Sequence, residues 1–255
     1  MWDPATYLRF GDERSRPFFD LVARIGAQRP RAVVDLGCGP GNLTAALASR
    51  WPGARVLGVD SSAEMVGQAR AESYPVDFEV GDLREWTPAG DHDVVVSNAA
   101  LQWVPGHESL LPRWVAALPA GAWLAVQVPG NFDAPSHRAL RSLSVAAGLG
   151  DLTRDAPVLD PAGYADLLAG AGCAVDAWET TYLHRLPVAP GADHPVLTWM
   201  EGTALRPVKA ALDGSAWRAF REALGKRLAA AYPARGTVVS FPFRRIFFVA
   251  RTQGD

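Results

Sequence analysis

One short segment restricts the folds open to this chain more than any other: an apolar run that leads into three alternating glycines. It reads Val33-Val34-Asp35-Leu36-Gly37-Cys38-Gly39-Pro40-Gly41-Asn42, and a helical pattern follows it. Glycines permit a tight turn and let a ligand approach the backbone where a Cβ atom would clash. The first turn of the following helix carries unpaired N–H groups and partial positive charge, which suit a carboxylate. The segment therefore predicts a strand, a ligand-binding loop and a helix.

The spacing of these glycines discriminates between ligands. A dinucleotide-binding loop has the spacing G-x-G-x-x-G, which would need glycine at position 42, where this chain has Asn42. The acidic Asp35 stands two residues before the first glycine and can accept a hydrogen bond from the amino group of the cofactor, which NAD lacks. The loop favours S-adenosylmethionine as the cofactor over a structural turn or another nucleotide.

Polar residues also follow the next predicted strands. Asp60 is placed to bond both ribose hydroxyls, Asp82 to bond the adenine amino group, and Asn98 to lie under the sulfonium. Met65 can pack on the adenine, and Trp103 offers an aromatic face to the sulfonium cation. The predicted cofactor-binding residues are Tyr7, Asp35, Gly37, Cys38, Gly39, Asp60, Ser61, Met65, Gly81, Asp82, Leu83, Asn98, Ala99 and Trp103.

Short apolar runs alternate with helical patterns over residues 32–130, which indicates a parallel sheet built from β-α-β units. Strands are predicted at Ala32–Leu36, Arg55–Asp60, Val76–Val80, Asp93–Ser97, Trp123–Val128, Ala174–Tyr182 and Arg244–Arg251. Helices are predicted at Asn42–Arg50, Ser62–Glu72, Glu108–Leu118, His137–Gly148, Pro161–Gly170 and Ser215–Tyr232. Ser61 with Glu64 predicts a capping box for the second helix. We therefore expect an α/β, Rossmann-like class I methyltransferase fold: a seven-stranded, mostly parallel sheet with helices on both faces and a late pair of strands.

The less regular segments predict how the chain is organised around that sheet. We expect a single domain over residues 1–255, with residues 1–30 as an N-terminal lid over the cofactor. Residues 131–172 and 187–240 are expected to form a helical cap above the carboxyl ends of the strands. Ligands bind at that edge in open α/β sheets, so the cap is the natural place for acceptor specificity.

Composition excludes several classes of protein. The chain has 25 basic and 27 acidic residues and a formal charge of −2, so nothing indicates a nucleic-acid partner. Lys209 and Lys226 are the only lysines, so almost all of the positive charge is arginine. This bias reflects either base composition or a use for arginine forks, which grip planar anions at two points.

The same reading predicts a soluble cytoplasmic protein. Cys38 and Cys173 make no disulfide framework, which suits a reducing compartment. The N-terminus has no apolar core of a signal peptide, and no apolar run is long enough to span a membrane. His137 and His184 lack the spacing of metal ligands, so no metal is expected. We expect a small-molecule partner and a monomer.

Beyond the glycine loop, several motifs are distributed along nearly the whole chain: Trp2-Asp3-Pro4, Glu13-Arg14-Ser15-Arg16-Pro17, Asn98-Ala99-Ala100-Leu101-Gln102-Trp103, Ala125-Val126-Gln127-Val128-Pro129, Leu205-Arg206-Pro207 and Phe241-Pro242-Phe243-Arg244-Arg245. In these motifs the chain resembles the trans-aconitate 2-methyltransferase family. The resemblance implies transfer of the methyl group of S-adenosylmethionine to a carboxylate of trans-aconitate, giving the monomethyl ester and S-adenosylhomocysteine. One departure lies after the fifth strand, where Phe132 stands at a position that is usually Trp in the family.

A carboxylate acceptor determines which side chains the reaction needs. Because such a group is already ionised at neutral pH, no general base is required and no catalytic residue is predicted. A polycarboxylate does need positive charge, for which Arg206 is the first candidate and Arg244 the second. The remaining predicted substrate-binding residues are Gln102, Asn131, His137, Tyr182, Trp199 and Thr203.

Other functions stay open at this point. A methyltransferase acting on another small carboxylic acid or on an acyl-carrier thioester would share the cofactor loop, and an acidic carrier protein would need a basic rim. A regulator that binds the cofactor without turnover would also share it. An NAD-dependent oxidoreductase is disfavoured by Asn42 and Asp35.

Overall fold

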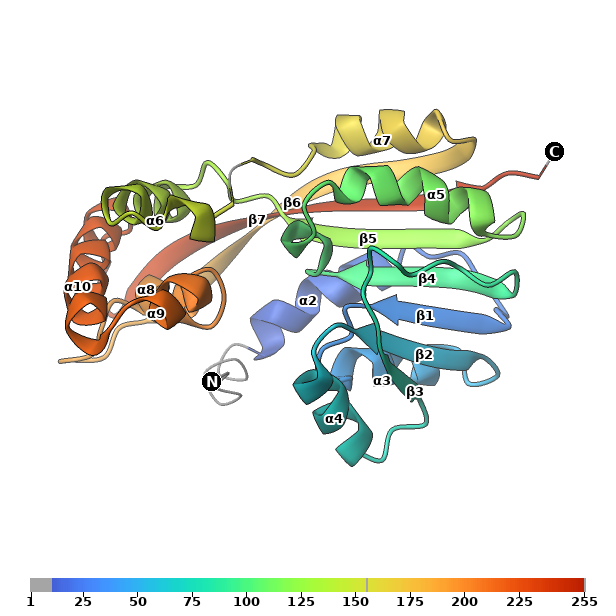
Figure 1. The fold of residues 1–255 in the computed structure, drawn as a ribbon, viewed down its shortest axis with the longest axis horizontal. Coiled ribbons are helices and arrows are strands. Elements are labelled where there is room, and N and C mark those ends of the chain that lie inside the picture. Colours follow the sequence, from blue (N-terminus) through green and yellow to red (C-terminus); the bar gives the residue numbers. More distant parts are fainter. Residues whose placement is uncertain (1–10, 155, 255) are drawn as a thin grey trace. The chain divides into compact units, whose positions relative to one another are not determined.

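A seven-stranded sheet forms the centre of the fold in a computed structural model that describes residues 11–154 and 156–254 (Figure 1). The strands are β1 Ala32–Leu36, β2 Arg55–Asp60, β3 Asp77–Val80, β4 His92–Asn98, β5 Trp123–Pro129, β6 Cys173–Pro187 and β7 Val238–Thr252. They lie in the order β3-β2-β1-β4-β5-β7-β6. Strands β1 to β5 pair in parallel, and β7 pairs antiparallel to β5. The predicted fold class is confirmed.

The chain divides into two compact units, which we describe separately. Of the described residues, the sheet unit contains 15–129, 159–180 and 245–254, and the helical unit contains 11–14, 130–154, 156–158 and 181–244. The helices are α2 Gly11–Val22, α3 Asn42–Arg50, α4 Ala63–Ala71, α5 Leu110–Ala117, α6 Pro135–Ala146, α7 Pro161–Ala169, α8 Pro195–Glu201, α9 Arg206–Ala211 and α10 Gly214–Ala231. Single 3-10 turns occur at Leu101–Trp103, His107–Ser109 and Gly150–Leu152.

The sheet unit is held together by buried apolar strands. All five residues of β1 are buried, as expected for a central strand covered on both faces. Phe18, Leu21 and Ile25, from the segment predicted as a lid, are also buried in this unit. Residues 15–30 therefore pack as part of the core of the sheet unit, whereas residues 1–10 lie outside the described part of the chain.

Helix α7 belongs to the sheet unit, although its residues were expected in the cap. It lies beside α5, as Figure 1 also shows. The physical reason is Tyr164, which is fully buried. Its ring lies 4.7 Å from the ring of Phe248, and its hydroxyl is 2.7 Å from Nε2 of His107. The predicted cap segment 131–172 is thus divided, and the part after Val158 packs with the sheet.

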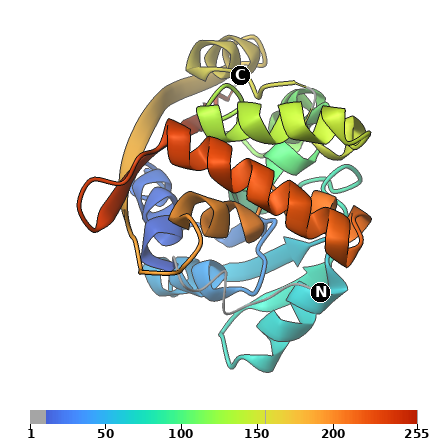
Figure 2. The same cartoon turned by 90° about the vertical axis from the view of Figure 1, so that its left-hand side faces the viewer.

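The helical unit has its own hydrophobic core. Helices α6 and α10 pack side by side in Figure 2, and α8 packs against α10. Helix α10 buries Phe220, Leu224 and Leu228 along one face, while Asp213 caps its first turn by accepting from the N–H groups of Ser215 and Ala216. No helix in residues 11–154 or 156–254 is long and apolar enough to cross a membrane.

Local differences from the sequence prediction are few. Helix α4 is capped by Ser62, whose Oγ accepts from the N–H of Met65, so the capping box predicted at Ser61 is wrong. Helices α8 and α9 were not predicted. Strands β6 and β7 are longer than expected, and the added residues lie where each strand runs into the helical unit.

Candidate functional site

Three predicted polar residues meet at one edge of the sheet unit. Strand β1 pairs with β2 on one side and with β4 on the other, so their carboxyl ends are neighbours. Asp35 lies near the end of β1, Asp60 is the last residue of β2, and Asn98 is the last residue of β4. The topology therefore brings together residues that are far apart in the sequence, at the edge where open α/β sheets bind ligands.

The glycine loop follows β1 at this edge, and each of its glycines has a positive φ: 81° at Gly37, 56° at Gly39 and 82° at Gly41. A Cβ atom on Gly37 would lie 2.2 Å from Cβ of Ala100, and one on Gly41 would lie 2.6 Å from the ring of Phe78. A Cβ atom on Gly39 would meet nothing within 4 Å. Packing thus explains the first and third glycines, and Gly39 leaves open backbone for a ligand.

The carboxylate of Asp60 is bound to the backbone on both sides. Its Oδ2 accepts from the N–H of Gly39 at 2.9 Å, and its Oδ1 accepts from the N–H of Ser62 at 2.9 Å. Each carboxylate oxygen can accept a further hydrogen bond. The acid is half-buried and held in one orientation, so it can receive two hydroxyl donors from a ribose.

Asp35 lies beneath the loop and is almost completely buried. The hydroxyl of Thr44, in α3, donates to Oδ2 of Asp35 at 2.7 Å and leaves Oδ1 to another donor. Burial raises the pKa of this carboxyl to about 6; the Thr44 hydrogen bond opposes that rise, and the charge of Asp60 adds to it. A cationic ligand beside Asp35 would stabilise its ionised form.

The end of β4 and the turn after it contain two side-chain oxygens that accept no hydrogen bond from the residues that the structure describes. Oδ1 of Asn98 and Oε1 of Gln102 are buried with no hydrogen-bond partner in the described part of the chain. Between them, Ala99 has a φ of 54°, a left-handed conformation that is uncommon for a residue other than glycine. Buried acceptors are costly unless a donor reaches them. An N–H-bearing, cationic ligand fits this edge of the sheet.

Several other predicted cofactor residues have local roles. Cys38 packs its thiol with Val66, Ala69 and Phe78, so its side chain supports the loop from below. Leu83 is buried, Met65 and Gly81 are half-buried, and Ser61 and Trp103 are exposed. Tyr7 lies outside the described residues. Contact between these residues and a cofactor stays a prediction.

Asp82 follows β3 and has a partner that the sequence analysis missed. Arg84 Nε donates to both Oδ1 and Oδ2 of Asp82 at 3.0 Å. The Arg84 side-chain hydrogen bond lowers the pKa of Asp82 to about 2, together with the backbone N–H of Arg84. An adenine amino group would therefore share this carboxylate with a guanidinium. The spacing of residues along the chain does not predict the pairing of Arg84 with Asp82, because this pairing depends on the conformation of the turn after β3.

Predicted substrate residues of the helical unit fall into buried and accessible groups. Asn131 is buried; its Nδ2 donates to the carbonyl oxygen of Arg244 at 2.9 Å, and its Oδ1 accepts from the N–H of Arg244 at 2.8 Å. Trp199 is buried too, with its ring 4.6 Å from that of His184. Both residues make contacts within the helical unit, and their contact with a substrate stays a prediction.

The other predicted substrate residues of the helical unit differ in their exposure to solvent. Arg206 is exposed at the first residue of α9. Thr203 and His137 are partly exposed, whereas Tyr182 is 5% exposed. The predicted substrate contacts of Arg206, Arg244, Thr203, His137 and Tyr182 remain predictions, as does the contact of Gln102 in the sheet unit.

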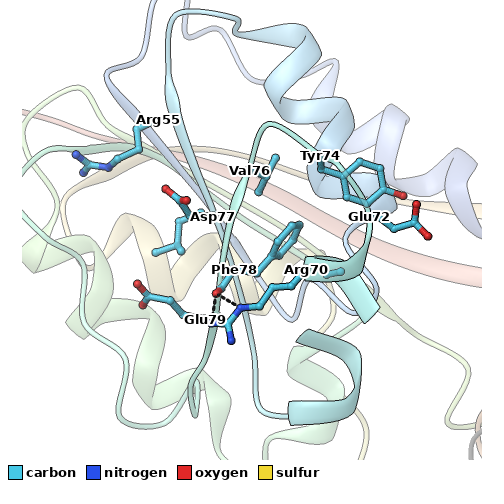
Figure 3. Close-up of a pocket in the computed structure, with 10 residues that line it drawn as sticks. Arg55, Arg70, Glu72, Tyr74, Val76, Asp77, Phe78 and Glu79 are labelled. Atoms are coloured by element: carbon cyan, nitrogen blue, oxygen red, sulfur yellow. Dashed lines mark hydrogen bonds between the residues drawn. The ribbon is translucent and has the colours of Figure 1, made fainter. Parts of the chain in front are cut away.

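A pocket of about 470 Å3 lies elsewhere on the sheet unit, along β3 (Figure 3). Its lining includes Arg55 and Asp77, the first residues of β2 and β3, and extends along β3 to Glu79. Arg70 donates from Nε to the carbonyl oxygen of Phe78 at 3.0 Å, as Figure 3 shows. The loop glycines and Asp60 are not among the residues that line this pocket, although Ala69 and Phe78 of the lining pack against the glycine loop. No group of three or more potential metal ligands occurs within residues 11–154 and 156–254.

The strand order and the glycine loop define a class I methyltransferase fold. A family model described as a methyltransferase domain matches residues 33–121. Among solved structures, YcgJ of Bacillus subtilis has a TM-score of 0.61 at 12% identity, covering 94% of this chain and 99% of that chain. Phosphoethanolamine N-methyltransferase 2 of Haemonchus contortus, solved with S-adenosyl-L-methionine, has a TM-score of 0.56 at 17% identity, covering 94% of this chain and 53% of that one.

Sequence relatives are much more similar. Trans-aconitate 2-methyltransferase of Mycolicibacterium gilvum is 56% identical over 260 residues, covering 99% of this chain and 100% of the relative. The protein of that name from Mycobacterium tuberculosis is 53% identical over 262 residues, covering 100% of this chain and 98% of the relative. The chain belongs to the trans-aconitate 2-methyltransferase family.

Proposed function

We propose that this chain transfers the methyl group of S-adenosylmethionine to a carboxylate of trans-aconitate, giving the monomethyl ester and S-adenosylhomocysteine. The observation that carries this proposal is 56% identity, along nearly the whole chain, to a relative named for that reaction. The edge of the sheet unit supports it, because its free acceptors and open loop suit a cofactor with an ammonium group and a ribose.

Each part of that edge has a distinct task. Asp60 receives the ribose hydroxyls, and the open backbone at Gly39 lets the cofactor lie close to the loop. The ammonium group would donate to Oδ1 of Asp35, because Thr44 binds only the other oxygen of that carboxylate. It would also donate to the side-chain oxygens of Asn98 and Gln102, which have no partner in the described part of the chain. The bound cofactor supplies a methyl carbon activated by a sulfonium.

The acceptor side of the reaction needs no proton transfer. A carboxylate with a pKa near 4 is ionised at neutral pH, so no side chain has to act as a general base. The chain contributes by holding the acceptor oxygen in line with the methyl carbon, an effect worth up to roughly 7–11 kcal/mol in favourable cases. Arg206 and Arg244 are retained as candidate carboxylate contacts.

The two thiols support a proposal about the compartment in which the protein works. Cys38 and Cys173 are free and buried, which suits a reducing compartment. We include a cytoplasmic location and a monomeric state in the proposal.

The proposal is tested by following methyl transfer across a panel of acids. The purified chain is incubated with radiolabelled S-adenosylmethionine and a series of di- and tricarboxylates. We expect trans-aconitate to give the highest kcat/KM. If another acid gives a higher kcat/KM, the chain is still a carboxylate methyltransferase, but trans-aconitate is not its preferred substrate. If no acid leads to release of S-adenosylhomocysteine, the result favours a regulator that binds the cofactor without turnover.

A further inference from the structure

Cationic side chains gather around Phe132 in the helical unit. The guanidinium carbon of Arg141 lies 3.6 Å from the centre of the Phe132 ring, and that of Arg154 lies 5.9 Å from the same centre. Arg141 comes from α6 and Arg154 from the segment after the 3-10 turn Gly150–Leu152. Two guanidinium groups from separate segments therefore meet on one aromatic ring.

A hydrogen bond to the backbone orients the Arg141 side chain but does not neutralise its positive charge. Its Nη1 donates to the carbonyl oxygen of Phe132, a neutral acceptor. The carboxylate of Asp133 lies 3.9 Å from Nη2, but this side chain is 82% exposed, whereas that of Arg141 is 23% exposed. An exposed ion pair of this length contributes little. The fork of Arg141 is thus oriented by the backbone and still carries an excess of charge.

His137 lies in the same region and is a neutral imidazole at neutral pH. It precedes Arg141 by one helical turn, so both side chains lie on one face of α6. Burial lowers the pKa of His137 to about 4, and the charges of Arg154 and Arg141 lower it further. Burial also lowers the pKa of Arg141; Asp133 opposes that shift, and Arg138 adds to it. Burial and the positive charges of Arg154 and Arg141 therefore keep His137 in its neutral form.

We infer that Phe132, Arg141 and Arg154 form a subsite for the non-reacting carboxylates of a small polycarboxylate substrate. The inference rests on the proposed function and names the residues that select its substrate. Arginine forks bind carboxylates at two points, and the Phe132 ring supports both forks.

Four variants test the subsite in the full-length protein. Arg141→Gln and Arg154→Gln each remove one positive charge, and Arg141→Lys keeps the charge without the fork. The matched control is Arg227→Gln, since Arg227 is an exposed arginine of the same unit that donates to Ser142 Oγ at 3.0 Å. For each protein we would measure kcat/KM for trans-aconitate, its Kd by calorimetry with S-adenosylhomocysteine present, the Kd of S-adenosylmethionine, and Tm.

The expected result separates binding from folding. Each Gln variant should weaken trans-aconitate binding roughly 10- to 100-fold, as expected for the loss of hydrogen bonds to a charged group. Arg141→Lys should recover part of this loss, and Arg227→Gln should match wild type. The Kd of S-adenosylmethionine should stay constant in every variant. Constancy of this Kd shows that the sheet unit is intact, even if Arg141→Gln lowers Tm by losing its bond to Phe132.

Two results would overturn the inference, and they differ from each other. If wild type methylates trans-aconitate and both Gln variants keep its Kd and kcat/KM, the subsite is wrong and the proposed function stands. If wild type neither binds nor methylates trans-aconitate, the proposed function fails and the subsite fails with it.

Discussion

The backbone N–H of Gly39 donates to Oδ2 of Asp60 at 2.9 Å, which ties the loop after β1 to the acid at the end of β2. The second oxygen of Asp60 is bound to the start of α4 through the N–H of Ser62. One carboxylate therefore orients two elements of the cofactor site. A change at Asp60 should affect both the ribose contacts and the shape of the loop.

Asp60→Ala should weaken S-adenosylmethionine binding by about 1.5–3 kcal/mol, the usual cost of losing hydrogen bonds to a charged group. Calorimetry on the folded variant measures this directly. Asp77→Ala serves as a control, because Asp77 is an exposed acid at the start of β3. Unchanged affinity in a folded Asp60→Ala protein would remove Asp60 from the cofactor site.

Two glycines of the same loop should respond differently to substitution. Gly37→Ala combines a left-handed backbone with a Cβ atom 2.2 Å from Ala100, so it should lower the free energy of unfolding by roughly 2–5 kcal/mol. Gly39→Ala meets no neighbour and should cost only the conformational strain, roughly 1–2 kcal/mol. It should nevertheless weaken S-adenosylmethionine binding, since the new methyl group enters the space kept for the ligand.

Urea denaturation and calorimetry on both variants separate these effects. Gly53→Ala is the matched control, because a Cβ atom there also meets nothing and its φ is not positive. A Gly39→Ala protein that binds the cofactor like wild type would show that the open backbone is not a binding surface.

The sheet could be predicted because its signals are local. Strands β1 and β2 have the predicted bounds, since each is an apolar run that ends at a glycine or an acid. Helices α8 and α9 were missed because their segment is rich in Pro and Gly, and packing against the rest of the helical unit stabilises them. Residues of α7 were assigned to the cap because nothing in the sequence shows that Tyr164 meets Phe248.

The candidate site also combines features that the sequence predicts with features that depend on tertiary packing. The loop glycines, Asp35 and Asp60 follow from spacing along the chain, and the structure brings them to one edge. The partners Thr44 and Arg84 could not be predicted, because each depends on how a helix or turn is oriented. Trp199 and Asn131 were chosen as substrate contacts from residue type, whereas their burial depends on tertiary packing.

The raised pKa of Asp35 makes a prediction about stability and pH. The folded-state pKa of about 6 lies above the ordinary value of 3.8, so the folded protein holds this proton more tightly than the unfolded chain. The contribution is fully present below pH 3.8 and is lost as pH rises through about 6. Over this window the free energy of unfolding should fall by roughly 3 kcal/mol from this group.

Asp35→Asn removes that titration and leaves the other carboxylates unchanged. Urea denaturation of both proteins at intervals between pH 4 and 7 gives the difference in unfolding free energy, in which the contributions of the shared groups cancel. Wild type should lose stability relative to Asp35→Asn as pH increases. A difference that does not vary with pH, or one that varies in the opposite direction, would show that Asp35 ionises without cost in the folded protein.

Turnover should be insensitive to pH if the nucleophile is already an anion. We expect kcat with trans-aconitate to be constant from about pH 6 to 8.5, above the range in which a carboxylate titrates. Steady-state rates at saturating cofactor and acid provide the measurement. A rate that increases with a group of pKa near 7, when chemistry limits turnover, would indicate a protonated acceptor such as a hydroxyl or an amine.

The bond formed by the transferred methyl group tests the central claim most directly. Wild type is incubated with S-adenosylmethionine carrying a 13C-labelled methyl group and with trans-aconitate, and the product is examined by 13C NMR and mass spectrometry. The account predicts one labelled methyl group on a carboxylate oxygen, formed together with S-adenosylhomocysteine in equal amount. A label found on carbon, nitrogen or sulfur, or no labelled acid with wild-type protein that binds the cofactor, would contradict it.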